Sequence, residues 1–196
     1  MVFMLGLKLP TDPRWANIAE KSIGEILIDH AFCEQKAAST CISLIVQYAD
    51  RPELVQALSP IVAEEWGHFR KVLKEMDARG IKLDKKRRDD YVHGLLAFQR
   101  KGVGEERVLL EKLLTCALIE ARSCERFRLL SLECSEPALR SFYHEFMVSE
   151  AGHYRLFMDL AERYLPREEV RTRWQEYLDY EAELLAGMEF RGDRVH

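Results

Sequence analysis

Glycine and proline are scarce in this sequence, with 10 and 6 among 196 residues. Both residues interrupt helices, so their scarcity favours long helices over a turn-rich sheet protein. Hydrophobic residues make up 47% of the chain and charged residues 32%, which suits amphipathic elements around one core. A chain of this length can bury one sizeable core. We therefore predict an all-α protein that forms a single domain over residues 1–196.

Long apolar runs are also missing. No segment approaches the ~20 uninterrupted apolar residues that a membrane-spanning helix requires, and the apolar stretch at the N-terminus is too short for a signal peptide. The expected protein is soluble and cytoplasmic, with no membrane partner. Its net charge of −4 gives no global argument for nucleic-acid binding, so any such contact must come from a local basic patch.

The cysteines lack the spacing of a metal or redox motif. There are five of them, none in a CxxC pair, and most lie in apolar helical stretches. This pattern is typical of reduced packing residues and excludes an iron–sulfur site or a rubredoxin-like pair. No GxGxxG fingerprint is present either, because Gly102-Val-Gly104 stands alone without a preceding strand. The chain therefore carries no evident electron-transfer group of its own.

What the sequence does contain is helical periodicity. A short opening helix is expected after Thr11-Asp12-Pro13, and a short helical piece is expected within a long link over residues 81–104. Four long helices and a charged fifth helix are expected over residues 23–48, 52–79, 105–133, 136–165 and 167–189. Two helical hairpins joined by one long link are the connectivity of a ferritin-like four-helix bundle with a long crossover, here with an extra C-terminal helix.

Charged residues fall on the apolar faces of these helices. The second and fourth long helices share a Glu-x-x-His spacing, in Glu65-Trp-Gly-His68 and Glu150-Ala-Gly-His153. Residues three apart lie on one side of a helix, so each pair points into the core together. Glu34 and Glu120 add one apolar-face glutamate on each partner helix, 31 and 30 positions before the matching glutamate. The two halves therefore resemble a pseudo-symmetric pair.

A buried carboxylate needs a compensating partner, which is either an arginine or a metal ion. Four inward glutamates and two histidines form the ligand set of ferritin-like di-iron and di-manganese proteins. Four carboxylates contribute −4 and two divalent ions +4, so the loaded site is neutral. The predicted metal ligands are Glu34, Glu65, His68, Glu120, Glu150 and His153. His30, one turn before Glu34, is either a support for this site or a core histidine.

Three segments resemble a known family. IEARSCERF at residues 119–127, DHAFCEQKAAS around Glu34 and SEAGHY around Glu150 are similar to the tRNA 2-methylthio-isopentenyladenosine hydroxylases. The resemblance covers nearly the whole chain. It departs at Phe69, where the family often has a second histidine, at Asp90, where an arginine is expected before Tyr91, and in the C-terminal EFRGDRVH.

The resemblance implies a function. In that family two non-haem Fe ions activate the co-substrate O2 and hydroxylate the isopentenyl side chain of a modified adenosine beside the tRNA anticodon. The implied partners are tRNA and a separate electron donor, a ferredoxin or a reductase. Alternatives are a ferritin-type iron-binding or storage protein and a peroxide-reducing di-metal protein. Manganese in place of iron stays open on the ligands alone.

A basic run in the crossover is the best candidate for phosphate contacts. It comprises Lys82, Lys85, Lys86, Arg87 and Arg88, with Arg100, Lys101 and Arg107 nearby. Residues Arg122, Glu125 and Arg126 of the IEARSCERF segment form either a salt-bridge network that supports their helix or part of the substrate entrance, and the sequence leaves both alternatives open.

Overall fold

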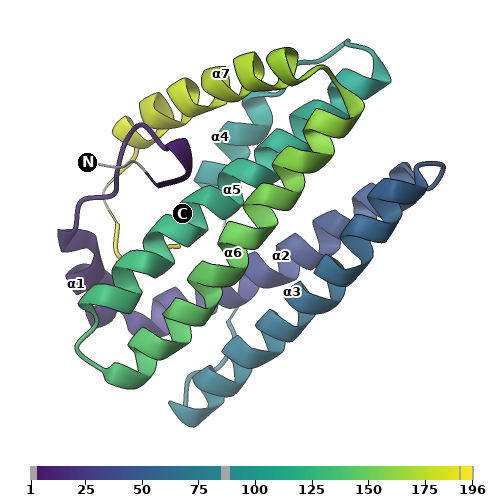
Figure 1. Ribbon diagram of the computed structural model, residues 1–196. Helices are drawn as coiled ribbons and strands as arrows, with labels where there is room; N and C mark the ends of the chain where they lie inside the picture. Colours follow the sequence, from purple (N-terminus) through teal and green to yellow (C-terminus); the bar gives the residue numbers. More distant parts are fainter. Residues whose placement is uncertain (1–3, 85–88, 190, 196) are drawn as a thin grey trace. The chain divides into compact units, whose positions relative to one another are not determined.

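The computed structural model describes residues 4–84, 89–189 and 191–195 (Figure 1). Across these ranges it has seven α-helices, one short 3-10 helix (Met4–Gly6) and no strand. Two compact units divide the chain: unit 1 contains residues 4–17 and 89–189, and unit 2 contains residues 18–84 and 191–195. Helix α1 (Arg14–Lys21) carries the boundary between them.

Unit 2 is a helical hairpin of α2 (Ile23–Gln47) and α3 (Pro52–Ala78), which lie side by side in Figure 1. Pro52 occupies the first turn of α3, where its missing N–H costs nothing. Gly80 follows α3 with a φ of +68°, a left-handed conformation that glycine adopts without a steric penalty. Both helices carry buried aliphatic side chains, among them Leu27 and Leu54.

Unit 1 contains a second hairpin, α5 (Glu105–Glu133) and α6 (Pro137–Tyr164). Two further helices, α4 (Asp90–Phe98) and α7 (Arg167–Ala186), contact each other and α5 (Figure 1). The Asp89 carboxylate caps α4 by accepting a hydrogen bond from the Val92 backbone N–H at 3.0 Å. Pro166 separates α6 from α7, because proline cannot continue a helix.

Helix α5 has buried side chains on two opposite sides. Glu120 and Arg122 are both buried, although two positions along a helix turn the side chain by about 200°. The Arg122 guanidinium donates to both Glu181 carboxylate oxygens, at 2.8 and 2.9 Å, and to Glu125 at 2.6 Å. It also donates to the Leu9 carbonyl at 2.9 Å. This buried arginine therefore ties α5 to α7 and to the N-terminal segment.

A second buried ion pair repeats this arrangement further along the same two helices. Arg173 of α7 donates to the two carboxylate oxygens of Glu111 on α5, at 2.8 and 2.7 Å. The Tyr177 hydroxyl donates to the same carboxylate at 2.7 Å. Two bidentate arginine–carboxylate contacts fix the position of α7 along α5 more tightly than apolar packing alone.

The predicted helices agree with the structure except at their ends. The piece expected within residues 81–104 is α4, which ends at Phe98, and α7 ends at Ala186 rather than at Glu189. The 3-10 helix at Met4–Gly6 was not predicted. No helix in the described part of the chain is long and apolar enough to cross a membrane. The single-domain organisation stays a prediction.

Replacing Arg122 by methionine should lower the free energy of unfolding by about 3–5 kcal/mol, because Glu181 then stays buried without its cation. The double variant Arg122→Met/Glu181→Leu should recover part of this loss. The matched control is Arg107→Met, which breaks an exposed pair with Glu169 and should change stability far less because solvent screens it. Urea denaturation measures the free energy of unfolding of all three variants. Equal losses of stability in Arg122→Met and Arg107→Met would contradict the assignment of Arg122 as a buried ion-pair partner.

Candidate metal centre

In unit 2, α2 and α3 bring two glutamates and one histidine together. His68 Nδ1 lies 3.4 Å from Glu34 Oε2 and 3.5 Å from Glu65 Oε2. Glu34 and Glu65 are buried, with 4% and 1% of their surface exposed, whereas His68 is half-buried. These three residues are here called the unit 2 triad. All three were predicted as metal ligands.

In unit 1, α5 and α6 form a corresponding cluster. Glu120, Glu150 and His153 are all buried, and each offers a ligand atom within 4.8 Å of the others. His153 Nδ1 lies 3.6 Å from Glu150 Oε2. These residues, the unit 1 triad, complete the predicted set. Each hairpin therefore carries one glutamate on its first helix and a Glu-x-x-His pair on its second.

Small side chains surround the glutamates on the first helices. Ala31 and Ala38 are buried on α2 beside Glu34, and Ala117 and Ala121 are buried on α5 beside Glu120. Alanine favours the helix and leaves space above the backbone for a carboxylate and a ligand.

His30 touches the unit 2 triad directly. Its Nε2 lies 2.7 Å from Glu34 Oε1, and both side chains are buried. The residues are four apart on α2, so one turn of helix sets this contact. His30 is therefore a buried histidine in contact with Glu34, and its role as a support for a metal ligand stays a prediction.

The donor set of each triad fits a divalent cation. Two carboxylates carry −2, which one divalent ion balances, and the imidazole adds a neutral nitrogen donor. Oxygen-rich donors with one nitrogen suit iron or manganese better than zinc or copper(I), which favour thiolates. The glutamates and histidines of the two triads are therefore consistent with a di-metal site. The charge of each triad balances one divalent ion.

Cys124, one turn after Glu120 on α5, does not add a thiolate to this set. Burial, together with the nearby Glu150 carboxylate, raises the pKa of the Cys124 thiol to about 12. The protonated thiol instead donates a hydrogen bond to the Met147 carbonyl, at 3.2 Å between sulfur and oxygen. Cys124 thus links α5 to α6 as a neutral group. All five cysteines are reduced, as predicted.

Arg122, Glu125 and Arg126 of the IEARSCERF segment belong to the support of the helix. Arg122 and Glu125 lie in the buried network with Glu181, and Thr11 donates to Glu125 through its backbone N–H and its hydroxyl, both at 2.7 Å. Arg126 lies 5.1 Å from the Trp15 ring, and burial lowers its pKa to about 10, with help from the nearby Arg122. This outcome favours the salt-bridge network over the substrate entrance.

Sequence reasoning missed the partners of this network. Glu111, Arg173 and Glu181 are buried, yet none stands out in the sequence, because α5 and α7 are rich in charged residues throughout. The one available signal was the narrow apolar stripe of α7, which includes Val170 and Tyr177. Glu181 is four positions after Tyr177 and so shares that stripe.

Two of the predicted phosphate-contacting residues are engaged elsewhere. Arg100 donates to Glu176 at 2.7 Å, and Arg107 donates to Glu169 at 2.7 Å. Lys82 is exposed. Residues Lys85, Lys86, Arg87 and Arg88 lie outside the described part of the chain.

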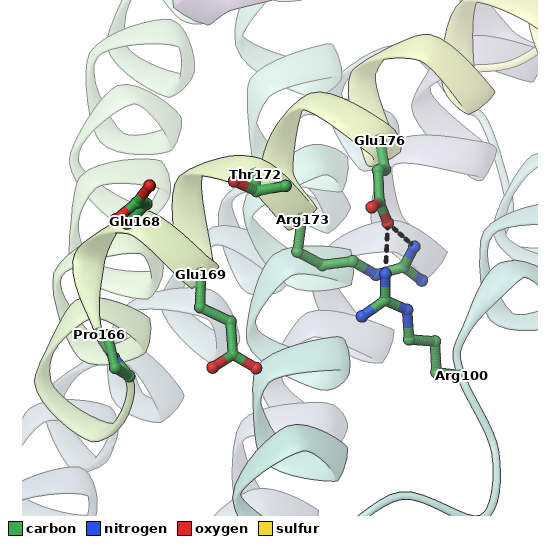
Figure 2. Close-up of a pocket in the computed structure, with 7 residues that line it drawn as sticks. All are labelled: Arg100, Pro166, Glu168, Glu169, Thr172, Arg173 and Glu176. Atoms are coloured by element: carbon green, nitrogen blue, oxygen red, sulfur yellow. Dashed lines mark hydrogen bonds and ion pairs between the residues drawn. The ribbon is translucent and has the colours of Figure 1, made fainter.

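A surface cavity of about 380 Å³ lies beside the start of α7 (Figure 2). Figure 2 shows Arg100 and Arg173 converging on Glu176, with Arg173 at 2.6 Å. Its lining carries two arginines against three glutamates, so it does not suit a polyanion. The lining residues are Arg100, Pro166, Glu168, Glu169, Thr172, Arg173 and Glu176.

Comparison with known proteins gives consistent matches. Residues 3–196 match the family described as tRNA-(ms2io6A)-hydroxylase (MiaE). A Pseudomonas putida protein named tRNA 2-(methylsulfanyl)-N(6)-isopentenyladenosine(37) hydroxylase is 39% identical over 158 residues, covering 81% of this chain and 76% of that protein. A Salmonella typhimurium protein of the same name is 29% identical over 228 residues, covering 91% of this chain and 83% of its own.

A solved structure is also similar. It is titled "Protein 43 with aldehyde deformylating oxygenase activity" from Synechococcus, and it is 38% identical with a TM-score of 0.91. The match covers 97% of this chain and 94% of that one. The predicted all-α, ferritin-like fold class is confirmed.

The state of Cys124 predicts its reactivity. With a pKa of about 12, only about one thiol in 10⁴ is ionised at pH 8, and the side chain is buried. N-ethylmaleimide should therefore label half-buried Cys33 of the native protein well before Cys124. Peptide mass spectrometry reads both sites, with urea-unfolded protein as the control in which both react. Rapid labelling of Cys124 in the native protein would show that its hydrogen bond to the Met147 carbonyl opens readily.

Proposed function

Because this chain belongs to the MiaE family of tRNA-(ms2io6A) hydroxylases, we propose that its two triads together bind two non-haem iron ions. The protein is a tRNA hydroxylase. It acts on the isopentenyl side chain of 2-methylthio-isopentenyladenosine at position 37 of tRNA. The observation that carries the metal assignment is the recurrence of one Glu/Glu/His donor set, buried at its glutamates, in both hairpins.

When bound, the iron pair supplies the activation of O2 that this reaction needs. One oxygen atom enters a C–H bond as a hydroxyl group, and the other leaves as water after taking up two electrons and two protons. The C–H bond is not acidic, so no general base is required of the chain. The protein's contribution is to hold the ions, admit the substrate and keep water out.

The triad residues hold the ions by charge and by fixed geometry. Their carboxylates balance one divalent cation per hairpin, and the histidines add neutral nitrogen donors. His30 fixes the orientation of Glu34 through its 2.7 Å contact, as partners of metal ligands commonly do. The buried Arg122–Glu181 pair holds α5, and with it Glu120, from the opposite side of the helix.

We propose that the electrons come from a separate protein, a ferredoxin or a reductase. The lack of a CxxC pair and of a dinucleotide fingerprint in the sequence supports this proposal. We further propose a cytoplasmic location, where tRNA and such donors are found together. The ferritin-type storage and peroxide-reducing alternatives are not retained, because the family match spans residues 3–196.

The ligand assignment predicts metal loss in single variants. Glu120→Ala and His153→Ala should each lower iron content sharply from about two per chain, because each removes a donor. The helical circular-dichroism signal should persist. Elemental analysis measures the metal, and Glu25→Ala, on a partly exposed glutamate of α2, is the matched control. Full iron occupancy in both ligand variants would refute the ligand assignment. Manganese in place of iron would show that the site binds manganese.

The function is tested on its substrate. Purified protein with iron, O2 and a ferredoxin system is incubated with tRNA that carries 2-methylthio-isopentenyladenosine, and the nucleosides are analysed by mass spectrometry. The expected product is heavier by one oxygen atom. Labelling from ¹⁸O2, and not from labelled water, identifies the oxygen source. No product with wild-type protein that holds two irons would refute the hydroxylase function.

The basic run remains the proposed phosphate-contacting segment. Reversing Lys85, Lys86, Arg87 and Arg88 to glutamate should weaken tRNA binding and flatten its salt dependence, because fewer counterions are released. Iron content should not change. The matched control is Arg107→Glu, at an arginine already engaged with Glu169. Unchanged hydroxylation in the fourfold variant would place the tRNA contacts elsewhere.

A further inference from the structure

An exposed tryptophan follows a proposed metal ligand in the sequence. Trp66 follows Glu65 on α3, so their Cα atoms are ~3.8 Å apart. Its side chain is 50% exposed, whereas Trp15 and Trp174 are 0% and 6% exposed. Exposing so large an apolar surface is unfavourable by itself, which points to a ligand that covers it in the working protein.

The metal motif does not require an aromatic residue at this position. The matching motif of unit 1 has Ala151 between Glu150 and Gly152, where unit 2 has Trp66 between Glu65 and Gly67. Both motifs keep their glutamate and their histidine in the triads. Trp66 is therefore an addition to the unit 2 motif, made on one hairpin only.

The indole has a supporting ring, and the helix surface at the next residue, Gly67, is open. The Phe69 ring lies 5.0 Å from the Trp66 ring, centroid to centroid, with an angle of 40° between the planes. This contact limits the rotation of the indole. At the neighbouring Gly67, an added Cβ would meet no atom within 4 Å. A planar group has room to approach the helix there.

Positive charge follows Trp66 along the same side of α3, up to the exposed Asp77 three positions after Lys74. Arg70 and Lys74 follow Trp66 at intervals of four residues and are exposed, so the three side chains form a line about 12 Å long. Lys71 is exposed as well. Glu75 is paired with Arg79 at 2.7 Å, and so its charge is largely satisfied within the helix. An aromatic face followed by cations is the pattern that binds single-stranded nucleic acid.

We propose that Trp66 stacks on a base of the anticodon loop that flanks the modified adenosine, while Arg70 and Lys74 contact the phosphates that follow. This inference rests on the proposed function, since it takes tRNA as the substrate. The adenosine's side chain must reach the metal ions. We assign the flanking base to Trp66 because Trp66 is next to Glu65 along α3 and its side chain points outward, about 100° around the helix from that of Glu65.

The direct test uses tryptophan fluorescence. Since Trp15 and Trp174 are buried, an RNA stem-loop with the anticodon-loop sequence should quench mainly the Trp66 emission. In Trp66→Phe the quenching should disappear while binding, measured by fluorescence anisotropy of labelled RNA, is kept. Quenching that persists in Trp66→Phe would refute the stacking contact.

The functional test distinguishes the contribution of aromatic stacking from that of apolar surface. Trp66→Leu keeps an apolar helix former but has no π face, so KM for tRNA should rise about 5- to 150-fold with kcat little changed. Trp66→Phe should stay close to wild type. Val46→Ala, at a still more exposed apolar residue of α2 (73%), is the matched control and should have no effect. Arg70→Glu and Lys74→Glu should weaken binding and reduce its salt dependence by about one charge each.

The outcomes are distinguishable. Equal KM values for Trp66→Leu and wild type, in an active enzyme, would overturn the inference and leave the hydroxylase function intact. A dimer that becomes a monomer in Trp66→Leu, with unchanged RNA affinity, would assign the surface to a second copy. Slower reduction by the ferredoxin with unchanged RNA affinity would assign it to the electron donor. RNA-dependent quenching in a protein that hydroxylates no tRNA would support the stacking contact and refute the function.

Discussion

The need to neutralise buried carboxylates governs this structure. Helix α5 alone buries Glu111, Glu120 and Glu125, and each would be strongly destabilising without a partner. Arg173 and Arg122 neutralise two of them through bidentate or short hydrogen bonds. Glu120 instead lies with the Glu150 carboxylate and the His153 imidazole, the group that we propose as ligands of a divalent cation. The partner of each acid therefore separates the ion-paired glutamates from the proposed metal ligands.

The same division explains how α5 serves two tasks. On one side it carries Glu120, a proposed metal ligand, and on the other it is joined to α7 by arginine–carboxylate pairs. Because these pairs are directional, they fix both the rotation of α5 and its position along the helix axis. Apolar packing alone would tolerate small shifts of one helix along another. The position of the proposed ligand Glu120 thus depends on charged contacts on the far side of the helix.

The relatives place this chemistry in a biological reaction. The chain is similar to two tRNA hydroxylases over most of its length, and to a Synechococcus protein with aldehyde deformylating oxygenase activity over nearly all of it. A shared ferritin-like fold supports different substrates, because the function depends on residues around the site rather than on the fold. Residues that differ between the two hairpins, such as Trp66 and Ala151, are where substrate recognition can be built without disturbing the ligands.

The sequence by itself determined the helices, the six candidate ligands and the family. Periodicity and the positions of proline and glycine set the helix limits, because these are local properties of the chain. The paired Glu-x-x-His motifs were visible because their spacing matches one turn of helix. Only the tertiary structure decided which charged residues of α5 and α7 meet, since Arg122–Glu181 and Arg173–Glu111 join positions about sixty residues apart. Such pairs depend on how helices pack, and charged residues on an already charged helix give no local signal of that packing.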